Sequence, residues 1–517
     1  MRRFINWKVS VALLFVISGS VKGESPVEHR KISFEEALQL TLQNNYLIKQ
    51  SSHHLQEMEQ DMKAAKGLRL PKVSLNAGYN LMEDKIHFDL TPVRDAILPL
   101  YQTLGSYGVF SGVPNPDPAT SGIMPILPDN ISTAVVRKKM LEGMTTVKSA
   151  NWDLTIQERQ FADLNAGFLW PIFTGGKINA ANKAAQIKYE TVAIENLQKS
   201  YELTNELIER YFGMVLAEQS VKVREEVKNT MEHHFQDAEK LQKQGQIANV
   251  EVLNAKLYLA DSEREWQKSI RQNSIVNEAL LNTLADKEIY TIQPVTSLFY
   301  LDSLENVEYY YALALQKSPL LAQVNKKKEL AEEGYKAEKS GHLPSVAITG
   351  MYDIANKDLS PYLPGYMVGV GMKWNLFEGN SQNNKIKALS FQKMQVEDYF
   401  QKASSDLHTA INKHYQELSM YREQLQMLDA AMDLAREYYR VRNKAFSEGM
   451  ATSTQVADAS LMLAKARIDR LQAMYGYDVS LSKLLYYAGI TDQYISYMRR
   501  ANAKMGDIEQ ATVTSKM

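Results

Sequence analysis

The segment LWPIFTGGK at residues 169–177 ends a short apolar stretch and begins a long proline-free run, and it nearly recurs as KWNLFEGNS at 373–381. Each copy places a tryptophan and a phenylalanine before a glycine. Glycine adopts backbone angles that other residues avoid, so it allows a strand to turn sharply into a helix. The recurrence predicts that the chain makes the same strand-to-helix turn twice.

A tandem duplication explains this recurrence. TLQNNYLIKQ at 41–50 aligns with ALQKSPLLAQ at 314–323, a shift of 273 in the numbering. Further along, GQIANVEVLNAKLYLA at 245–260 aligns with GMATSTQVADASLMLA at 449–464, a shift of 204. The first half therefore carries 69 extra residues, which is 273 minus 204. We divide the chain into a first repeat at 24–304, a second repeat at 305–490 and a C-terminal tail at 491–517.

Both halves contain long proline-free spans with a helical period. Apolar residues recur in alternating steps of four and three from Leu407 to Tyr439, and again from Ile194 to Val215. This spacing is typical of helices that pack along one seam. The seams break at Gly245 and Gly449, although a continuous helix that tolerates a glycine is the alternative. We predict helical hairpins at 175–288 and 380–488, with tips near 245–252 and 449–456, and shorter preceding helices at 32–68 and 305–341.

Four short stretches alternate between apolar residues and small or polar residues, at about 71–82, 161–173, 344–355 and 365–377. Alternation over about ten residues is typical of strands that span a membrane. Two soluble hairpins packed on a core are the alternative. Four strands cannot enclose a channel, so several chains must contribute, and three chains would supply twelve strands.

The extra residues of the first half lie between the first two predicted strands. Seven of the fifteen prolines fall in this segment, as in VFSGVPNPDPATSGIMPILPDN at 109–130. Proline and glycine interrupt regular structure. The segment 83–160 is therefore predicted to be a long, irregular loop insertion.

The N-terminus and the composition limit the classes of function. Basic residues precede the apolar run VALLFVI at 11–17, which predicts a secretory signal peptide at 1–23. The chain has no cysteine, so disulfides and thiolate metal sites are excluded. Its 59 basic and 60 acidic residues nearly cancel, which gives no electrostatic reason to expect a nucleic-acid partner. No histidine pair has the spacing of a zinc protease, and we expect no catalytic site, cofactor or metal.

The mature chain resembles the TolC family of outer-membrane efflux proteins. The matching motifs occur in family order: ISFEEALQLTLQNNYLIKQ at 32–50, GLRLPKVSLNAGY at 67–79, the two strand-to-helix junctions, and the tips QGQIANVEVLNA and EGMATSTQVADA. The resemblance implies a mixed α/β membrane protein. It implies a homotrimer in which a twelve-stranded transmembrane β-barrel in the lipid of a Gram-negative outer membrane continues into a long α-helical coiled-coil barrel in the periplasm.

The resemblance also implies a function without enzyme chemistry. Family members are passive exit ducts that serve a periplasmic adaptor protein and an inner-membrane pump of the RND or ABC type. The insertion at 83–160 would be exposed at the cell surface or fold back into the mouth of the channel. A trimeric exported coiled-coil protein, structural or adhesive, is the alternative, but it does not explain the strand pairs. The sequence does not indicate the cargo.

Site residues follow by matching motif positions. Relatives narrow the periplasmic entrance with two rings of aspartate; Asp458 matches one position, whereas Gln455 occupies the other. Glu251 occupies the acidic position of the first tip, and Phe446 the aromatic position of the latch that holds the closed state. A solvated helix charge is an equally good interpretation of Asp458. The tips would dock the adaptor through Gly245, Val252, Ala255, Gly449, Val456 and Ala459, and the membrane-interface junctions are Trp170, Phe173, Gly175, Trp374, Phe377 and Gly379.

Overall fold

A computed structural model describes residues 29–286 and 290–506. The predicted signal peptide and residues 507–517 of the predicted tail lie outside the described residues. The chain forms two compact units. Among the described residues, the helical unit comprises 29–63, 183–286, 290–335 and 387–506, and the strand unit comprises 64–182 and 336–386.

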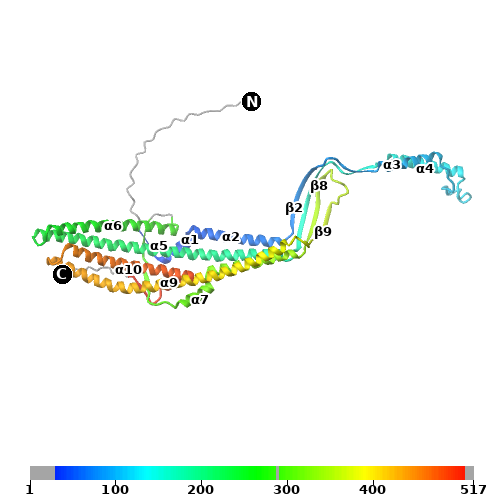
Figure 1. Ribbon diagram of the computed structural model, residues 1–517. Coiled ribbons are helices and arrows are strands. Elements are labelled where there is room, and N and C mark those ends of the chain that lie inside the picture. The colour runs from blue at the N-terminus through cyan, green and yellow to red at the C-terminus, as the bar shows by residue number, and fades with distance from the viewer. Residues whose placement is uncertain (1–28, 287–289, 507–517) are drawn as a thin grey trace, which may run out of the picture. The chain divides into compact units, whose positions relative to one another are not determined.

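The helices occur in pairs that reproduce the sequence repeat (Figure 1). The two longest helices have 67 residues each, and their first residues, Lys177 and Ser381, are repeat equivalents. Two 11-residue helices begin at the equivalent residues Phe34 and Val307. The first repeat has α1 (Phe34–Asn44), α2 (Tyr46–Lys66), α5 (Lys177–Lys243) and α6 (Asn249–Leu284); the second has α7 (Val307–Lys317), α8 (Pro319–Lys339), α9 (Ser381–Ser447) and α10 (Ser453–Tyr487).

The helices that open each repeat are broken, whereas the sequence predicts one continuous helix for each. Asn45 separates α1 from α2 in an extended conformation. Its side-chain amide donates to the carbonyl of Thr283 at 2.9 Å, and its side-chain oxygen accepts from the amide of Leu47 at 2.9 Å. Short polar side chains compete in this way with the helical backbone bonds. Ser318 occupies the same place between α7 and α8.

An aromatic cluster forms the centre of the helical unit. Phe34 packs within 5.5 Å, between ring centroids, of Tyr211, Phe212 and Tyr494. The Tyr211 hydroxyl donates to the carbonyl of Ile32 at 2.8 Å and accepts from the amide of Thr296 at 3.1 Å. These contacts join the N-terminal segment, the middle of α5 and the C-terminal segment in one core.

Two small sheets border this cluster. Strand β1 (His29–Ile32) pairs in parallel with β6 (Thr291–Pro294), and β7 (Phe299–Leu301) pairs antiparallel with β10 (Ala503–Met505). The short helices η3 (Thr491–Gln493) and α11 (Tyr494–Met498) lie between α10 and β10. The prediction of a tail at 491–517 is therefore wrong up to residue 505. Tyr494 and Tyr497 are buried, and two aromatic residues in so short a segment are too few to reveal a helical period.

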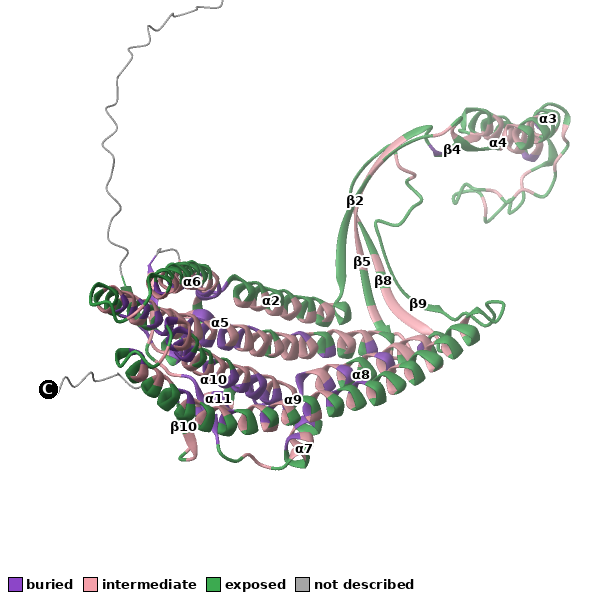
Figure 2. Cartoon of the chain, turned by 60° about the vertical axis from the view of Figure 1, so that its left-hand side comes forward, coloured by how far each residue is buried: buried purple, intermediate pink, exposed green. Residues whose placement is uncertain are grey.

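The predicted seams of the long helices face inward. Leu407, Ile411, Leu418 and Leu425 are almost completely buried, and buried residues line the sides on which α5, α9 and α10 pack (Figure 2). Leu197 is an exception, since it is 45% exposed. Among the described residues, no helix is both long enough and apolar enough to cross a membrane.

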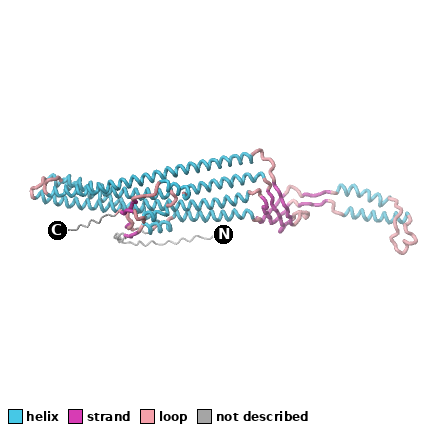
Figure 3. Tube along the Cα trace, turned by 90° about the horizontal axis from the view of Figure 1, so that it is seen from below, coloured by secondary structure: helices cyan, strands magenta, loops and turns pink. Residues whose placement is uncertain are grey.

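The strand unit contains a four-stranded antiparallel sheet in the order β2-β5-β8-β9. Its strands are β2 (Lys72–Leu81), β5 (Gln160–Phe173), β8 (Ser345–Lys357) and β9 (Tyr366–Lys373), drawn in magenta in Figure 3. Apolar side chains on one face are open to solvent, among them Val73, Val368 and Val370, each at least 70% exposed. The outer edges of β2 and β9 have no strand partner in the described chain.

About half of the insertion between β2 and β5 is helical, so the prediction of an irregular loop over 83–160 is wrong. Strand β3 (Ile86–Asp89) pairs with β4 (Asp153–Gln157), and α3 (Thr91–Tyr107) packs against α4 (Asp129–Ser149). Proline density misled the prediction because five of the seven prolines lie between the two helices. Pro92 is in the first turn of α3, where a missing amide hydrogen has no cost.

Replacing Asp478 with asparagine is expected to raise the melting temperature at pH 8 but not at pH 4. Asp478 is completely buried, and burial raises the pKa of its carboxyl well above the usual range. Its two oxygens accept from the amide of Phe299 and the hydroxyl of Tyr494, both at 3.4 Å. The neutral carboxyl contributes its full stability below about pH 4, and this contribution is lost as the pH rises towards the folded-state pKa. Asparagine never ionises.

Differential scanning fluorimetry of the purified protein measures this difference. Asp458→Asn is the matched control because Asp458 lies on the same helix but is exposed. An equal gain for Asp478→Asn at both pH values would contradict the assignment of a neutral buried carboxyl.

Candidate functional site at the helical tips and strand junctions

Both helical tips use the same backbone turn. Gly245 and Gly449 follow α5 and α9 with positive φ angles of 75° and 73°. The amide of each glycine donates to the carbonyl three residues earlier at 2.9 Å, and the next amide donates to the carbonyl five residues before it. This is the Schellman arrangement, which requires a left-handed residue after the helix. Both glycines are exposed, so the turns are accessible.

A small apolar core joins the two hairpins at their tips. It consists of Ala238 from α5, Ala255 from α6, Phe446 from α9 and Val456 from α10, all buried. The Phe446 ring lies 4.4 Å from the ring of His234, between centroids. Phe446, assigned by resemblance to a latch, therefore packs within the chain. Each of the four helices contributes one side chain, so the core holds the hairpins together.

The predicted docking residues divide into two groups. Ala255, Val456 and Ala459 are completely buried and cannot touch a partner while the tip core is intact. Val252 is half-buried, and Gly245 and Gly449 are exposed. Adaptor docking remains a prediction, and in this conformation the exposed turns offer the accessible surface for it.

The Glu251 carboxylate, at the tip between α5 and α6, caps the N-terminus of α10, which follows the tip between α9 and α10. The Glu251 side chain accepts a hydrogen bond from the backbone amide of Ser453 at 2.7 Å. Ser453 is the first residue of α10. A negative charge at a helix N-terminus is stabilising because the free amides there carry partial positive charge. This hydrogen bond is a second link between the two hairpins.

The two tips differ at repeat-equivalent positions. Gln455 is the repeat equivalent of Glu251, and it forms a capping box with Thr452 through hydrogen bonds of 3.2 and 3.3 Å. Ala248 is the equivalent of Thr452 and has no side-chain oxygen to accept from its own helix. Because the first tip has no capping box, the Glu251 side chain is available to bond the other hairpin. Gln455 and Glu251 therefore both stabilise the start of α10.

Asp458 lies on the exposed side of α10. No hydrogen bond or ion pair joins its carboxylate to another of the described residues. This charge is free to face solvent or a neighbouring copy, so the prediction that Asp458 narrows an entrance stays open. Among the described residues, no group of three histidine, aspartate or glutamate side chains could hold a metal ion.

Sequence reasoning missed a basic groove beside the tip core. Residues from the ends of α5 and α9 line it, including Lys240, Arg436, Arg440 and Lys444. Three of these four cations pair with a carboxylate on their own helix, namely Asp237, Asp433 and Glu437. The three residues from α9 are four apart and so share one face of the helix. That spacing was the available signal. The groove also contains the Phe446 edge of the tip core.

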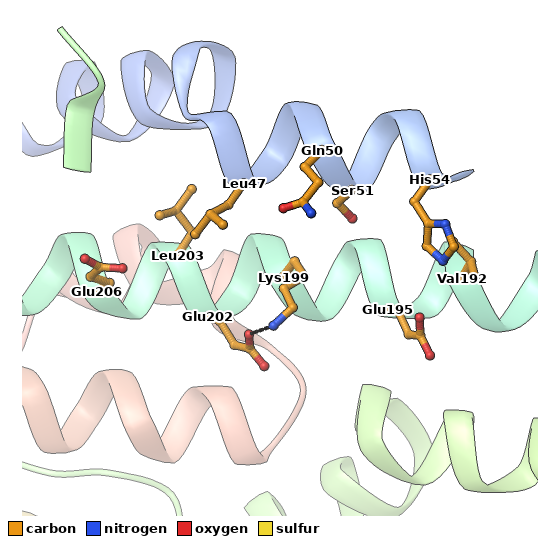
Figure 4. A pocket seen from close by; sticks show the side chains of 10 residues that line it. All are labelled: Leu47, Gln50, Ser51, His54, Val192, Glu195, Lys199, Glu202, Leu203 and Glu206. Atoms are coloured by element: carbon orange, nitrogen blue, oxygen red, sulfur yellow. Dashed lines mark hydrogen bonds and ion pairs between the residues drawn. The ribbon is translucent and has the colours of Figure 1, made fainter. Parts of the chain in front are cut away.

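A second groove lies between α2 and α5 in the helical unit. Figure 4 shows its lining, in which Lys199 pairs with Glu202 at 2.7 Å. His54 is bound to Glu57 at 3.0 Å. Glu206 pairs with Arg210 on its own helix at 3.4 Å, whereas no hydrogen bond or ion pair joins Glu195 to another of the described residues. No hydrogen bond joins Ser51 to His54 within the described chain, so the groove holds no nucleophile paired with a base.

Each of the two strand-to-helix junctions contains an equivalent tryptophan hydrogen bond. The indole nitrogen of Trp170 donates to the carbonyl of Arg69 at 3.1 Å, and that of Trp374 donates to the carbonyl of His342 at 3.1 Å. Both donors and acceptors are repeat equivalents. Each bond ties the end of a strand to the turn that precedes the neighbouring strand, β2 or β8.

The glycines of the junctions allow the chain to enter the long helices. Gly175 and Gly379 have φ angles of 62° and 58°, which other residues rarely adopt. Phe173 is 46% exposed and Phe377 is 86% exposed. Together with the indole rings of Trp170 and Trp374, which are 40% and 53% exposed, they make a partly exposed apolar border. A membrane interface would suit such aromatic residues.

Parts of this chain are similar in sequence to known proteins. A family model described as outer membrane efflux protein matches residues 143–283 and 310–489. The alkaline protease secretion protein AprF of Pseudomonas aeruginosa is 21% identical over 320 residues, which cover 60% of this chain and 66% of AprF. The match thus spans slightly less than two thirds of that relative.

Solved structures share the fold. A membrane protein from Pseudomonas aeruginosa superposes with a TM-score of 0.66 at 11% identity, covering 88% of this chain and 90% of that chain. The CmeC outer membrane channel of Campylobacter jejuni superposes with a TM-score of 0.64 at 11% identity, covering 89% and 86%. At this identity the likeness establishes architecture only.

Replacing Glu251 with glutamine is expected to loosen the link between the tips. A charge at a helix N-terminus contributes about 0.3–1 kcal/mol, so amide exchange at the start of α10 should accelerate about two- to fivefold. Hydrogen-deuterium exchange with mass spectrometry of peptides covering 453–460 measures this rate. Glu263→Gln, an exposed position on the same helix as Glu251, is the control. Unchanged exchange in the Glu251 variant would refute the cap.

Proposed function

Because this chain belongs to the outer membrane efflux protein family, we propose that it forms the exit duct of an efflux or secretion system. The family places it in the outer membrane of a Gram-negative bacterium. The observation that carries the proposal is the combination, in each repeat, of a pair of strands with a very long helical hairpin. A 67-residue helix extends for about 100 Å at 1.5 Å per residue, which suits a conduit rather than a compact core.

A trimer is the assembly that the sheet supports. Unpaired strand edges at β2 and β9 expose backbone groups that favour pairing with another chain. If β9 of one copy pairs with β2 of the next, three copies of four strands make a closed sheet of twelve strands. Closure leaves no edge free. The exposed apolar face, with Val73 and Val368, would then meet lipid.

The tips would form the periplasmic end and receive an adaptor protein. The exposed turns at Gly245 and Gly449 and the basic groove on α5 and α9 offer the contact surface. An inner-membrane pump of the RND or ABC type would supply the cargo. We infer no enzymatic activity, since the family and the structural neighbours are channel proteins.

In this proposal the inner-membrane pump determines which cargo is exported. AprF is named for secretion of an alkaline protease, whereas the similar structure from Campylobacter jejuni is described as an outer membrane channel. This chain therefore resembles proteins with different descriptions. A trimeric adhesin, the second possibility from the sequence, leaves the solvent-exposed apolar face of the sheet without a role.

The assembly is tested with single cysteines, since the natural chain has none. Gln246→Cys and Met450→Cys, each next to a tip glycine, should crosslink to a copurifying adaptor through a short bifunctional maleimide. Asp61→Cys, on α2, is the control and should not. The protein should fractionate with outer membranes and migrate as a trimer in native gels. A soluble protein without adaptor adducts would exclude the duct.

The role of Asp458 is tested by electrophysiology. If three copies of this carboxylate surround the entrance, they attract cations and bind divalent ions between them. Asp458→Ala should then raise single-channel conductance in planar bilayers and weaken block by divalent cations. Asp61→Ala removes the same charge far along the chain and should leave both unchanged. Identical traces for Asp458→Ala and the parent would remove Asp458 from the entrance.

A further inference from the structure

The helical hairpin of the insertion is a well-packed structure. Helices α3 and α4 approach closely at two glycines: a Cβ atom at Gly105 would lie 3.0 Å from Leu141, and one at Gly143 would lie 3.0 Å from Tyr101. The Arg137 guanidinium donates to the carbonyl of Gly108 at 2.8 Å. The facing sides of the two helices therefore satisfy one another within the chain.

The opposite side of α3 carries an unpartnered stripe. Val93, Ala96, Leu100, Thr103 and Tyr107 follow steps of three, four, three and four, and all five are exposed. Exposure is 46% at Val93, 57% at Leu100 and 79% at Tyr107. Alternating steps of three and four are the spacing of a coiled-coil seam. We call these five residues the α3 stripe.

The charge of α3 is unusual for an exposed helix. Its only charged residues are Arg94 and Asp95, which pair with each other at 2.7 Å, and residues 96–107 carry none. By contrast, α4 has the basic run Arg137, Lys138 and Lys139. Exposed helices normally present charged residues to water. The uncharged side of α3 is suited to burial against another surface.

We propose that the α3 stripe packs against the same stripe of two other copies in a parallel three-helix coiled coil. This inference rests on the proposed trimer, because pairing of β9 with β2 would arrange three insertions around one axis. A rotationally symmetric contact near its axis sets identical residues against one another. A neutral stripe meets its copies without repulsion, whereas the basic run of α4 would repel its copies. Charge therefore selects α3 as the inner helix.

The hairpin is also connected firmly enough to transmit this arrangement. Strands β3 and β4 pair antiparallel between the sheet and the helices. His87 binds Asp153 across this ribbon at 2.6 Å, and the Gln157 side chain donates to the carbonyl of Asp358, at the end of β8, at 2.9 Å. The insertion thus continues from paired strands.

Disulfide trapping in outer membranes tests the proposal. Leu100→Cys and Tyr107→Cys, seven residues apart on the α3 stripe, should each give a dimer of the chain on non-reducing denaturing gels after mild oxidation. Gln102→Cys lies on the same helix, is exposed and is outside the stripe, so it should give several-fold less dimer. Two variants on the stripe guard against a failure of one to fold.

The outcomes separate this proposal from the proposed duct. Protein that is trimeric in native gels but forms no stripe dimer would overturn the coiled coil and leave the duct standing. Equal dimer from Leu100→Cys and Gln102→Cys would also overturn it, because random collision would then explain the product. A disulfide adduct of another mass would identify a foreign partner as the occupant and overturn the self-association. Absence of any trimer would overturn both proposals.

Discussion

The packing of Phe34 against Tyr211, Phe212 and Tyr494 is the contact on which the helical unit depends. Each long helix buries one narrow seam, and a narrow seam alone gives little resistance to sliding. The aromatic cluster fixes the middle of α5 to the N-terminal segment and to α11. This contact lies far from both ends of α5. Truncating a buried phenylalanine typically costs about 3–5 kcal/mol, so loss of this contact would affect the whole unit.

The two repeats share their framework and differ where they meet. The junction hydrogen bonds of Trp170 and Trp374 are equal in length and equivalent in position. At the tips, by contrast, Glu251 reaches the other hairpin while its equivalent Gln455 caps its own helix. Duplication thus provides two copies of a strand and helix unit. The difference between Glu251 and its equivalent Gln455 then allows a hydrogen bond that links the tips of the two hairpins.

Much of the architecture was predictable because it follows from periodicity. The alternating strands, the seams and the two tip glycines are repeated signals, and the repeat itself set their register. Competition between side-chain and helical hydrogen bonds was harder to predict. Asn45 interrupts a helical pattern through two side-chain hydrogen bonds, one of which reaches a residue 238 positions away. The helices of the insertion were missed because the prolines between them dominated the composition of the segment.

The candidate site was less predictable than the fold. Phe446 and Val456 occupy positions where an apolar residue can either face a partner or fill a core, and only the arrangement of four helices decides between them. Glu251 and Asp458 are both acidic tip residues in the sequence. In the structure, Glu251 lies beside the N-terminus of α10 and caps it, whereas Asp458 is exposed.

The equal lengths of α5 and α9 limit how such a protein can change its size during evolution. Inserting residues in one long helix alone would displace its tip by about 1.5 Å per residue and part Glu251 from Ser453. A viable change has to occur in both repeats, and in steps of about seven residues if the seams are to stay in register. Loops between strands have no such coupling. The 69 surplus residues of the first repeat lie between two strands, where an insertion in one repeat alone can be tolerated.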